Sequence, residues 1–403
     1  MTLGIVYHMP FWRDADGTLR EIEGSFARYV DSLAPYFDEI LLCVPVLPAP
    51  AGGGTPVRAS NVTLAPLPAF DGPVQFYPRL ASVLPRLTRW VRAVDVVHCR
   101  VPTPAAVFAF AIARWFRRPA FLLVVGDLQA LLPSMPYRGV KRILWRAYTA
   151  FEERNVQWMA DRALTFANGP ALAAKHTRSA RTVFETRTTT IDERDIASRA
   201  DTCAGPRIRA LVVSRVDPRK GLRVLPAAIR RVVDAGVDLT LDVVGPLVGA
   251  PGEDERRAVV AAAEQFAVAD RVSLVGAVPL EQLLPMYARY DLFVLPTRPG
   301  EGIPRVLLEA MSAGLPVVTT RTAGIPGLVQ HEVNGLLVDE PSPEAVAQAM
   351  LIVVRDGALR SRLIANGYAT ARSHTLQAQA ARMTTTVSSE LRLALRASPV
   401  AAR

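Results

Sequence analysis

Short apolar runs alternate with longer amphipathic stretches along most of the chain. This alternation is typical of parallel strands buried beneath helices on both faces of a sheet. In the first half it predicts strands over residues 3–7, 39–45, 95–99, 120–125 and 162–167, and helices over 24–37, 79–94, 104–116 and 139–159. The first half is therefore expected to form a doubly wound α/β domain.

The alternation restarts after a polar, charged segment, residues 186–206, which we interpret as a linker. Further strands are predicted over residues 207–214, 239–245, 271–276, 290–296, 315–320 and 335–339. At 403 residues the chain exceeds the roughly 250 to 300 residues at which single cores stop growing. We predict an α/β fold of two Rossmann-like, doubly wound domains facing across a cleft. The domains cover 1–195 and 206–375, and a helix within 376–403 packs back toward the first domain.

Composition supports a well-packed protein. Hydrophobic residues make up 50% of the chain and charged residues 21%, which excludes disorder as the main state. The formal net charge is +10, and arginine carries nearly all of the positive charge, because the lysines are only Lys141, Lys175 and Lys220. Two interpretations of this arginine-rich charge remain open. It could reflect a compositional bias of the source genome, or it could attract phosphate-bearing partners such as anionic lipid or nucleotide.

The cysteines and the N-terminus bear on the compartment. Cys43, Cys99 and Cys203 are odd in number and show no Cys-x-x-Cys spacing, which fits a reducing compartment and argues against structural zinc. The N-terminal MTLGIVYHMPFW lacks a basic region and has too short an apolar core for a signal peptide. No uninterrupted apolar span reaches the ~18 residues of a membrane helix. We expect a cytoplasmic protein that can touch a membrane surface.

The segment SRVDPRKG, residues 214–221, follows the first predicted strand of the second half. That strand would deliver Arg215 and Lys220 to its carboxyl end, where open α/β sheets bind ligands. A guanidinium fork and an ammonium point charge suit a diphosphate. For this motif alone, a solvated basic turn is the alternative.

A strand, a loop, a helix and a second strand are predicted over residues 290–318. The loop carries Glu301, Gly302 and Ile303, and Pro304 is expected in the first turn of the helix. The free amides and the dipole of a helix start attract anions, and glycine lets a ligand approach the backbone closely.

Glu309 is expected about a turn and a half into the same helix, among apolar neighbours. A carboxylate in such surroundings is costly unless it is paired or hydrogen-bonded. Together with Glu301 it could accept hydrogen bonds from sugar and ribose hydroxyls. The alternative for Glu309 is a helix position that faces solvent.

These motifs together resemble the donor half of the retaining glycosyltransferases with a GT-B fold, family 4. The likeness rests on SRVDPRKG after a strand, on EGIPRVLLEAMSAGLPVV with its two glutamates, and on the later AGIPGLV and NGLLVD segments. It is collinear over residues 211–339 and extends over 1–200 in layout only.

The resemblance implies that Arg215 and Lys220 bind the donor diphosphate and take part in catalysis. It further implies that Glu301 takes part in catalysis and that Glu301 and the nearby backbone of Gly302, Ile303 and Pro304 hold the donor sugar. These roles come from the family pattern and from the matching positions in this chain.

The resemblance also implies that Glu309 binds the ribose hydroxyls and that backbone around Gly245-Pro246 and Val278-Pro279 frames the base. The donor would be a UDP- or GDP-hexose, which is a substrate. No cofactor and no metal are expected, because cations and helix dipoles stabilise the leaving diphosphate. The anomeric configuration would be retained.

The first half departs from the family pattern. Many relatives carry paired glycines after the first strand, where the donor phosphate meets the acceptor. Here a long loop, HMPFWRDADGTLREIEG, ends in the single Gly24 at a helix start, which we assign to the donor side. After the strand over 120–125, where many relatives carry a histidine motif, stand Gly126 and Asp127. Asp127 is our candidate for positioning the acceptor hydroxyl, with a strand-end turn as the alternative.

Two histidines and an arginine are further acceptor-side candidates. His98 and Arg100 follow a buried strand in VVHCRVPTP and could face the cleft, as could His8 after the first strand. For both histidines, a structural role is the alternative.

Two basic amphipathic helices suggest where the acceptor lies. Residues 79–94 and 139–159 each combine arginines with large apolar residues. Such helices can lie on an anionic leaflet. Alternatively, the apolar faces pack on the sheet and the arginines stay in solvent; the two interpretations can coexist.

The predicted function is transfer of a hexose from a nucleotide diphosphate sugar to a glycan or lipid-linked glycan in cell-surface polysaccharide biosynthesis. The enzyme would be cytoplasmic and peripheral on the inner face of the plasma membrane. A GT-B epimerase or phosphorylase is one alternative. A non-catalytic basic module that binds membrane or nucleic acid is another, but no nucleic-acid motif supports it, so we expect no nucleic-acid partner. The first strand is not followed by Gly-x-Gly-x-x-Gly, which argues against a dinucleotide oxidoreductase.

Overall fold

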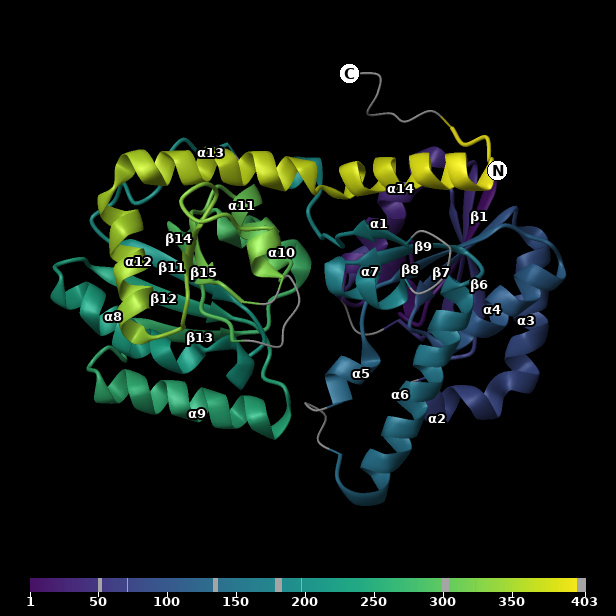
Figure 1. Cartoon of the computed structure of the whole chain (residues 1–403), viewed down its shortest axis with the longest axis horizontal. Coiled ribbons are helices and arrows are strands. Elements are labelled where there is room, and N and C mark those ends of the chain that lie inside the picture. The colour runs from purple at the N-terminus through teal and green to yellow at the C-terminus, as the bar shows by residue number, and fades with distance from the viewer. Residues whose placement is uncertain are drawn as a thin grey trace. The chain divides into compact units, whose positions relative to one another are not determined.

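The structure, a computed structural model, describes residues 1–49, 53–70, 72–132, 137–177, 183–196, 198–298, 304–322 and 324–396. The chain divides into two compact units (Figure 1). Unit 1 comprises Met1–Thr188 and the described chain from Gln377 onward, and unit 2 comprises Thr189–Leu376.

Unit 1 is built on a seven-stranded parallel sheet, sheet 1, in the order β10-β9-β8-β7-β1-β4-β6. Its strands are β1 (Thr2–Val6), β4 (Glu39–Pro45), β6 (Val62–Leu67), β7 (Val96–Val101), β8 (Ala120–Val124), β9 (Leu164–Asn168) and β10 (Val183–Thr186). The five strands predicted for this half are confirmed. The sequence pattern missed β6 and β10, because these edge strands are partly exposed and lack a continuous apolar run.

The described part of unit 1 contains helices in addition to sheet 1. They are α1 (Ser25–Leu33), α2 (Gly72–Phe76), α3 (Leu80–Ala93), α4 (Pro104–Trp115), α5 (Leu128–Leu131), α6 (Gly139–Ala160), α7 (Pro170–His176) and α14 (Leu376–Leu391). The core contact between α3 and β1 shows how closely the layers fit. Trp90 of α3 lies over Gly4 of β1, where a Cβ would come within 2.6 Å of the indole ring. Burying a large apolar side chain contributes roughly 1.5–3 kcal/mol.

The stretch after β1, predicted as a long loop, is a β-hairpin in its middle part. β2 (Phe11–Arg13) pairs with β3 (Leu19–Glu21), and β3 pairs with β5 (Thr55–Pro56), all antiparallel. The turn closes when the amide of Gly17 donates to the carbonyl of Asp14 at 2.9 Å, with Gly17 at a φ of 85°. The loop prediction was wrong here because the Asp-Gly turn signal was not weighed against the short flanking strands.

Unit 2 is built on a six-stranded parallel sheet, sheet 2, in the order β13-β12-β11-β14-β15-β16. Its strands are β11 (Ile208–Val213), β12 (Leu239–Val244), β13 (Val272–Gly276), β14 (Leu292–Leu295), β15 (Val317–Thr320) and β16 (Leu336–Val338). All six were predicted. The helices of unit 2 are α8 (Leu225–Asp234), α9 (Gly249–Gln265), α10 (Leu280–Tyr287), α11 (Val306–Ser312), α12 (Pro343–Arg355) and α13 (Gly357–Ser373).

Unit 2 also takes in residues that the sequence pattern left to the linker. Ile191 is fully buried in the unit 2 core. The amide of Arg199 donates to the hydroxyl of Tyr368 at 2.9 Å, and its guanidinium donates to the carbonyl of Tyr290 at 2.8 Å. These contacts attach the linker firmly to unit 2, although its composition is polar.

The C-terminal helix, α14, is part of unit 1 from Gln377 onward. The hydroxyl of Tyr29 on α1 donates to the sulfur of Met383 on α14 at 3.2 Å, in a buried contact. The chain thus passes from unit 2 back into unit 1 at α14.

Candidate functional site

The carboxyl ends of β11, β12 and β14 bring three loops together at one edge of sheet 2. The amide of Val216, after β11, donates to the carbonyl of Pro246, after β12, at 3.0 Å. The amide of Arg298, after β14, donates to the carbonyl of Arg219 at 2.7 Å. The predicted cation loop therefore lies at the edge where open α/β sheets bind ligands.

The three cations of the loop after β11 have different surroundings. Asp217 caps the short 3₁₀ helix Pro218–Lys220 and binds the guanidinium of Arg219 at 2.6 Å. This hydrogen bond, with that of the Arg219 amide, lowers the pKa of Asp217 to about 2. Arg219 is thus held by an internal ion pair, whereas Arg215 is exposed and Lys220 is buried. The two cations predicted to bind phosphate stand at one edge and differ in accessibility.

Two glycines allow these loops to approach one another. Gly221 has a φ of 66°, and a Cβ at this position would lie 2.0 Å from the carbonyl oxygen of Pro296. A Cβ on Gly245 would lie 1.9 Å from the carbonyl oxygen of Ser214. Only glycine fits at such close backbone approaches.

The residues predicted to frame a base lie along the same edge. Gly245 donates its amide to the carbonyl of Gly276 at 2.8 Å, joining the ends of β12 and β13. Pro246 is exposed, and Val278 is half-buried against the unit 2 core. Pro279 precedes α10 and accepts hydrogen bonds from the first turn of that helix.

The loop after β14 is only partly described. Glu301, Gly302 and Ile303 lie outside the described residues, so their predicted contacts with a donor sugar remain predictions. Pro304 is buried, and α11 begins at Val306. Pro304 therefore precedes the helix instead of standing in its first turn as predicted, with its carbonyl accepting from the amide of Leu307 at 3.2 Å.

Glu309 is buried, with 4% of its surface exposed, so the solvent-facing alternative is excluded. Its Oε2 accepts from the hydroxyl of Tyr287 at 2.7 Å, and its Oε1 accepts from the hydroxyl of Thr190 at 2.5 Å. It lies in the first turn of α11, earlier than predicted. Burial and the neighbouring carboxylate raise the pKa of Tyr287 well above its usual value, which keeps this phenol a donor. Sequence reasoning missed both hydroxyls, since neither stands in a recognisable motif.

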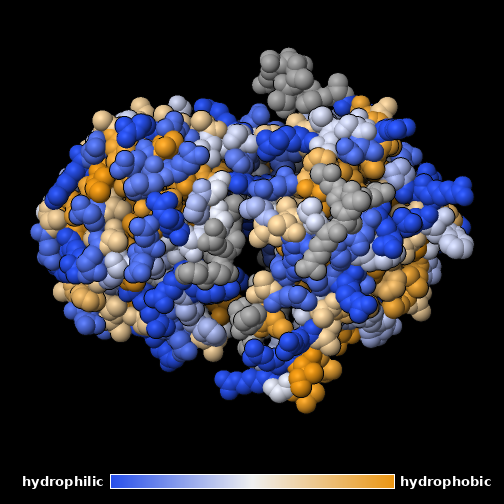
Figure 2. Space-filling view, in the orientation of Figure 1, coloured by the Kyte–Doolittle hydropathy of each residue, from blue (hydrophilic) through white to orange (hydrophobic). Residues whose placement is uncertain are grey.

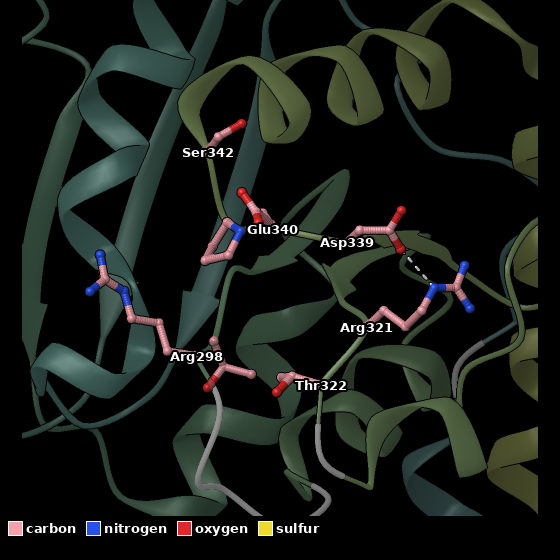
Figure 3. Close-up of a pocket in the computed structure, with 8 residues that line it drawn as sticks. Arg298, Arg321, Thr322, Asp339, Glu340 and Ser342 are labelled. Atoms are coloured by element: carbon pink, nitrogen blue, oxygen red, sulfur yellow. Dashed lines mark hydrogen bonds and ion pairs between the residues drawn. The ribbon is translucent and has the colours of Figure 1, made fainter.

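A pocket of about 530 Å³ opens at the same edge, beyond β14 (Figure 3). Its walls follow the carboxyl ends of β14, β15 and β16, and its lining residues are Thr297, Arg298, Arg321, Thr322, Asp339, Glu340, Pro341 and Ser342. Arg321 is paired with Asp339 at 2.8 Å. Thr297 connects the pocket to the cation loop, because its hydroxyl donates to the carbonyl of Arg219 at 3.1 Å. One arginine and one threonine follow each of these two buried strands, Thr297-Arg298 after β14 and Arg321-Thr322 after β15, and were a usable signal for this pocket.

In unit 1, Gly24 precedes α1 with a φ of 80°, at the helix start where the sequence suggested donor contact. Backbone amides at that helix start already donate to a carboxylate of the chain. Glu21 is fully buried and accepts from the amides of Glu23 at 2.9 Å and of Phe26 and Ala27 at 3.2 Å. Burial raises the pKa of Glu21. The assignment of Gly24 to the donor side remains a prediction, and Glu21 is a residue that sequence reasoning missed.

Asp127 uses both carboxylate oxygens within unit 1. Oδ1 caps α5 by accepting from the amides of Gln129 and Ala130 at 2.9 and 3.1 Å. Oδ2 pairs with Lys175 at 2.7 Å, and Lys175 also pairs with Glu153 at 2.7 Å. Burial works against ionisation of Asp127, but the Lys175 ammonium and the helix amides outweigh it, so the pKa of Asp127 is lowered. These contacts suit the strand-end alternative, and the acceptor role remains a prediction.

His98 is fully buried in β7, where its ring stacks on Phe121 with centroids 4.4 Å apart. Its Nε2 lies 2.9 Å from the hydroxyl of Tyr29. Burial, followed by the charge of Arg100, lowers the pKa of His98 to about 3. This neutral, enclosed ring fits the structural alternative.

Arg100 is enclosed by aromatic rings. Its Cζ lies 4.8 Å from the ring centroids of Tyr7 and Tyr29 and 5.1 Å from that of Phe26. Among the described residues, its Nε and Nη1 are buried without a hydrogen-bond partner. Burial and this cation lower the pKa of His8 to about 4, so His8 is neutral near pH 7. The acceptor roles predicted for both residues remain predictions.

Comparison with known families finds a match within unit 2. Residues 195–370 match the family model of glycosyl transferases group 1. This range contains Arg215, Lys220, the β14–α11 loop and Glu309.

Curated relatives match over a similar part of the chain. The amylovoran biosynthesis glycosyltransferase AmsK of Erwinia amylovora is 35% identical over 149 residues, which is 36% of this chain and 35% of that protein. The GDP-mannose-dependent alpha-(1-6)-phosphatidylinositol monomannoside mannosyltransferase of Mycobacterium tuberculosis is 36% identical over 174 residues, 41% of this chain and 42% of that protein. The matches thus span well under half the length of these relatives.

Solved structures match over nearly the whole chain. Anabaena HepE in complex with UDP and glucose has a TM-score of 0.67 and 20% identity, covering 96% of this chain and 100% of that one. WaaG, a glycosyltransferase involved in lipopolysaccharide biosynthesis, has a TM-score of 0.60 and 17% identity, covering 96% and 99%. The chain therefore has a GT-B fold of two Rossmann-like units, and its residues 195–370 match the group 1 glycosyl transferases.

Proposed function

We propose that this protein is a retaining glycosyltransferase that moves a hexose from a UDP- or GDP-sugar to a glycan or lipid-linked glycan. The observation that carries the proposal is the placement of Arg215 and Lys220 after β11, at the sheet edge shared with the β14–α11 loop. The family match over residues 195–370 supports it. The names of two relatives also support it: one is an amylovoran biosynthesis glycosyltransferase and the other a phosphatidylinositol monomannoside mannosyltransferase.

In this proposal, Arg215 and Lys220 stabilise the negative charge that develops on the leaving diphosphate. The bond between the anomeric carbon and the diphosphate oxygen breaks, the acceptor oxygen bonds to that carbon, and the proton of the acceptor hydroxyl passes to the departing diphosphate. Fixed cations are effective here, because they act where charge develops and need no reorganisation during the reaction.

Glu309 would hold the ribose of the donor. Each of its oxygens accepts one hydrogen bond from the protein and retains a lone pair for a ribose hydroxyl. The hydroxyls of Tyr287 and Thr190 would fix the carboxylate for this task. Glu301 with the backbone of Gly302 and Ile303 would hold the sugar, and the ends of β12 and β13 would frame the base. No cofactor or metal ion has a part in the proposed reaction.

We place the reaction in the cytoplasm, in cell-surface polysaccharide biosynthesis. The three free cysteines, Cys43, Cys99 and Cys203, support a reducing compartment.

Mass spectrometry of products formed from a panel of UDP- and GDP-hexoses with lipid-linked acceptors tests the activity. We expect acceptor mass to rise by one hexose, and NMR of the new linkage to show the donor's anomeric configuration. Release of an epimer or a sugar phosphate without glycan product would favour the epimerase or phosphorylase alternative. No turnover of any donor would overturn the proposal.

A further inference from the structure

The first half of α6, together with Phe151 just beyond it, exposes a stripe of large apolar side chains. Val140, Ile143, Leu144 and Phe151 have 71%, 67%, 63% and 51% of their surface exposed. Their spacing, with Ala147 between them, places them along one side of the helix. Single exposed apolar residues are ordinary, but a contiguous stripe marks an interaction surface.

The second half of α6 anchors the helix in unit 1. The residues that α6 buries are Thr149, at the end of the first half, and Glu152, Val156, Met159 and Ala160 in the second half. The hydroxyl of Tyr77 donates to Glu152 at 3.2 Å. The first half therefore extends from a fixed base, and Figure 1 shows it reaching past the other labelled elements of unit 1.

Positive charge surrounds the apolar stripe. The exposed cations of this stretch are Arg138, Lys141, Arg142 and Arg146. Residues 137–151 contain no aspartate or glutamate. Figure 2 shows hydrophobic and strongly hydrophilic side chains side by side at the lower tip of unit 1. Such a combination is typical of helices that lie in the interface of an anionic membrane.

Aromatic side chains complete this part of the surface. Trp145 stacks on Tyr137 with ring centroids 5.1 Å apart, and Tyr148 meets Trp145 edge-on at 5.5 Å. Lys141 lies 4.6 Å from the centroid of the Tyr137 ring. Tryptophan and tyrosine are favoured at membrane–water interfaces because one end is apolar and the other is polar.

The other basic amphipathic helix, α3, behaves differently. Its large apolar residues Val83, Leu87, Trp90 and Val91 are buried in the unit 1 core. Its arginines point to solvent without an exposed apolar stripe, as in the alternative that the sequence left open. The structure thus separates two helices that the sequence could not tell apart.

We propose that the first half of α6 docks on an anionic lipid bilayer. The docking face consists of Val140, Ile143, Leu144 and Phe151 with Arg138, Lys141, Arg142 and Arg146. The apolar stripe would enter the boundary between headgroups and acyl chains, while the cations bind anionic headgroups. The described helices include none long and apolar enough to cross a bilayer. The proposal does not depend on the catalytic activity.

Co-sedimentation of the full chain with vesicles tests the docking face. Vesicles of equal parts phosphatidylcholine and phosphatidylglycerol are compared, at low salt, with vesicles of phosphatidylcholine alone. We expect wild type to bind the anionic vesicles. Lys141→Glu/Arg142→Glu and Ile143→Ser/Leu144→Ser should each weaken binding by about tenfold or more. The first variant removes charge and the second removes apolar surface, and because all four side chains are exposed, melting curves should be unchanged.

The matched control is Arg86→Glu/Arg89→Glu on α3, which makes the same change in net charge. We expect it to lower vesicle binding by less than about threefold, through the general field of the protein. Three outcomes would overturn the proposal. Wild type could fail to bind the anionic vesicles at low salt, or the α3 and α6 charge variants could lose vesicle binding equally. The third outcome is that both α6 variants bind the anionic vesicles as tightly as wild type. If instead the α6 variants change the solution mass of the protein and leave vesicle binding intact, the surface is a contact between copies, which also overturns it.

Discussion

The hydroxyl of Tyr287 donates to Oε2 of Glu309 at 2.7 Å, and both side chains are buried in unit 2. This bond joins the end of α10 to the start of α11. The hydroxyl of Thr190 donates to the other carboxylate oxygen, Oε1. A buried carboxylate held from both sides is oriented before any ligand arrives, which would lower the cost of the ribose binding that we propose for it.

Tyr287→Phe should lower both stability and nucleotide affinity. The change leaves one buried carboxylate oxygen without its donor, which costs about 1–3 kcal/mol in the free energy of unfolding. Urea denaturation measures the stability, and calorimetric titration measures the affinity for UDP and GDP. Tyr290→Phe is the control, since its hydroxyl binds Asp242 at 2.7 Å. It should lower stability similarly and leave nucleotide affinity unchanged; equal loss of affinity in both variants would contradict the role of Glu309.

Gly221→Ala should damage the cation loop. Gly221 and Gly236 have φ values of 66° and 85°, but only Gly221 faces a close neighbour, the carbonyl oxygen of Pro296. Gly236→Ala should therefore cost only the backbone strain of about 1–2 kcal/mol. Gly221→Ala should cost about 1–3 kcal/mol more, because the loop must shift. It should also abolish measurable nucleotide binding, as followed by titration. Equal stabilities of the two variants would show that the loop does not need this close approach.

Stability should depend on pH through His8. Its pKa is lowered to about 4 in the folded protein, mainly by burial and then by Arg100, from an ordinary value of 6.5. Between these values the unfolded chain binds a proton that the folded protein does not, so stability is present above pH ~6.5 and falls as pH drops toward 4. The free energy of unfolding of His8→Gln, measured by denaturation across this range, should fall less steeply than that of wild type. If the free energies of unfolding of the two proteins fall equally steeply with pH, the lowered pKa of His8 is refuted.

Asp127→Asn separates a structural from a catalytic role. Asparagine keeps an oxygen to cap α5 but removes the charge that pairs with Lys175. Because this pair is partly exposed, we expect a stability loss of about 1 kcal/mol or less. Transfer rates should stay close to wild type, and Lys175→Met should behave similarly. A large drop in kcat at unchanged stability would instead establish Asp127 as the group that positions the acceptor hydroxyl.

The fold was largely predictable because buried parallel strands leave apolar runs, as β11, β14 and β16 do. The edge strands β6 and β10 were not, since they are half-exposed. In unit 2, the cations after β11 and the carboxylate on α11 stand in recognisable spacing. Their partners do not: Thr190 and Tyr287 reach Glu309 across 119 and 22 positions, and such contacts follow from packing.

The two amphipathic helices α3 and α6 show a second limit of prediction from the sequence. Periodicity shows that a helix has an apolar side but not what that side contacts. Trp90 on α3 is buried in the core, whereas Leu144 on α6 is exposed. Only the positions of neighbouring elements distinguish a face that packs on a sheet from one that is free.

Calorimetric titration of UDP and GDP into wild type, Arg215→Ala and Arg231→Ala tests the central claim most directly. Arg231 is the control, an exposed arginine in the last turn of α8, the helix that leads away from the cation loop. We predict that wild type binds at least one nucleotide and that Arg215→Ala weakens this binding by about 10- to 100-fold, the worth of a charge-assisted hydrogen bond. Arg231→Ala should bind like wild type. No binding of either nucleotide to wild type, or equal affinities of all three proteins, would contradict the claim that this sheet edge is a nucleotide-sugar site.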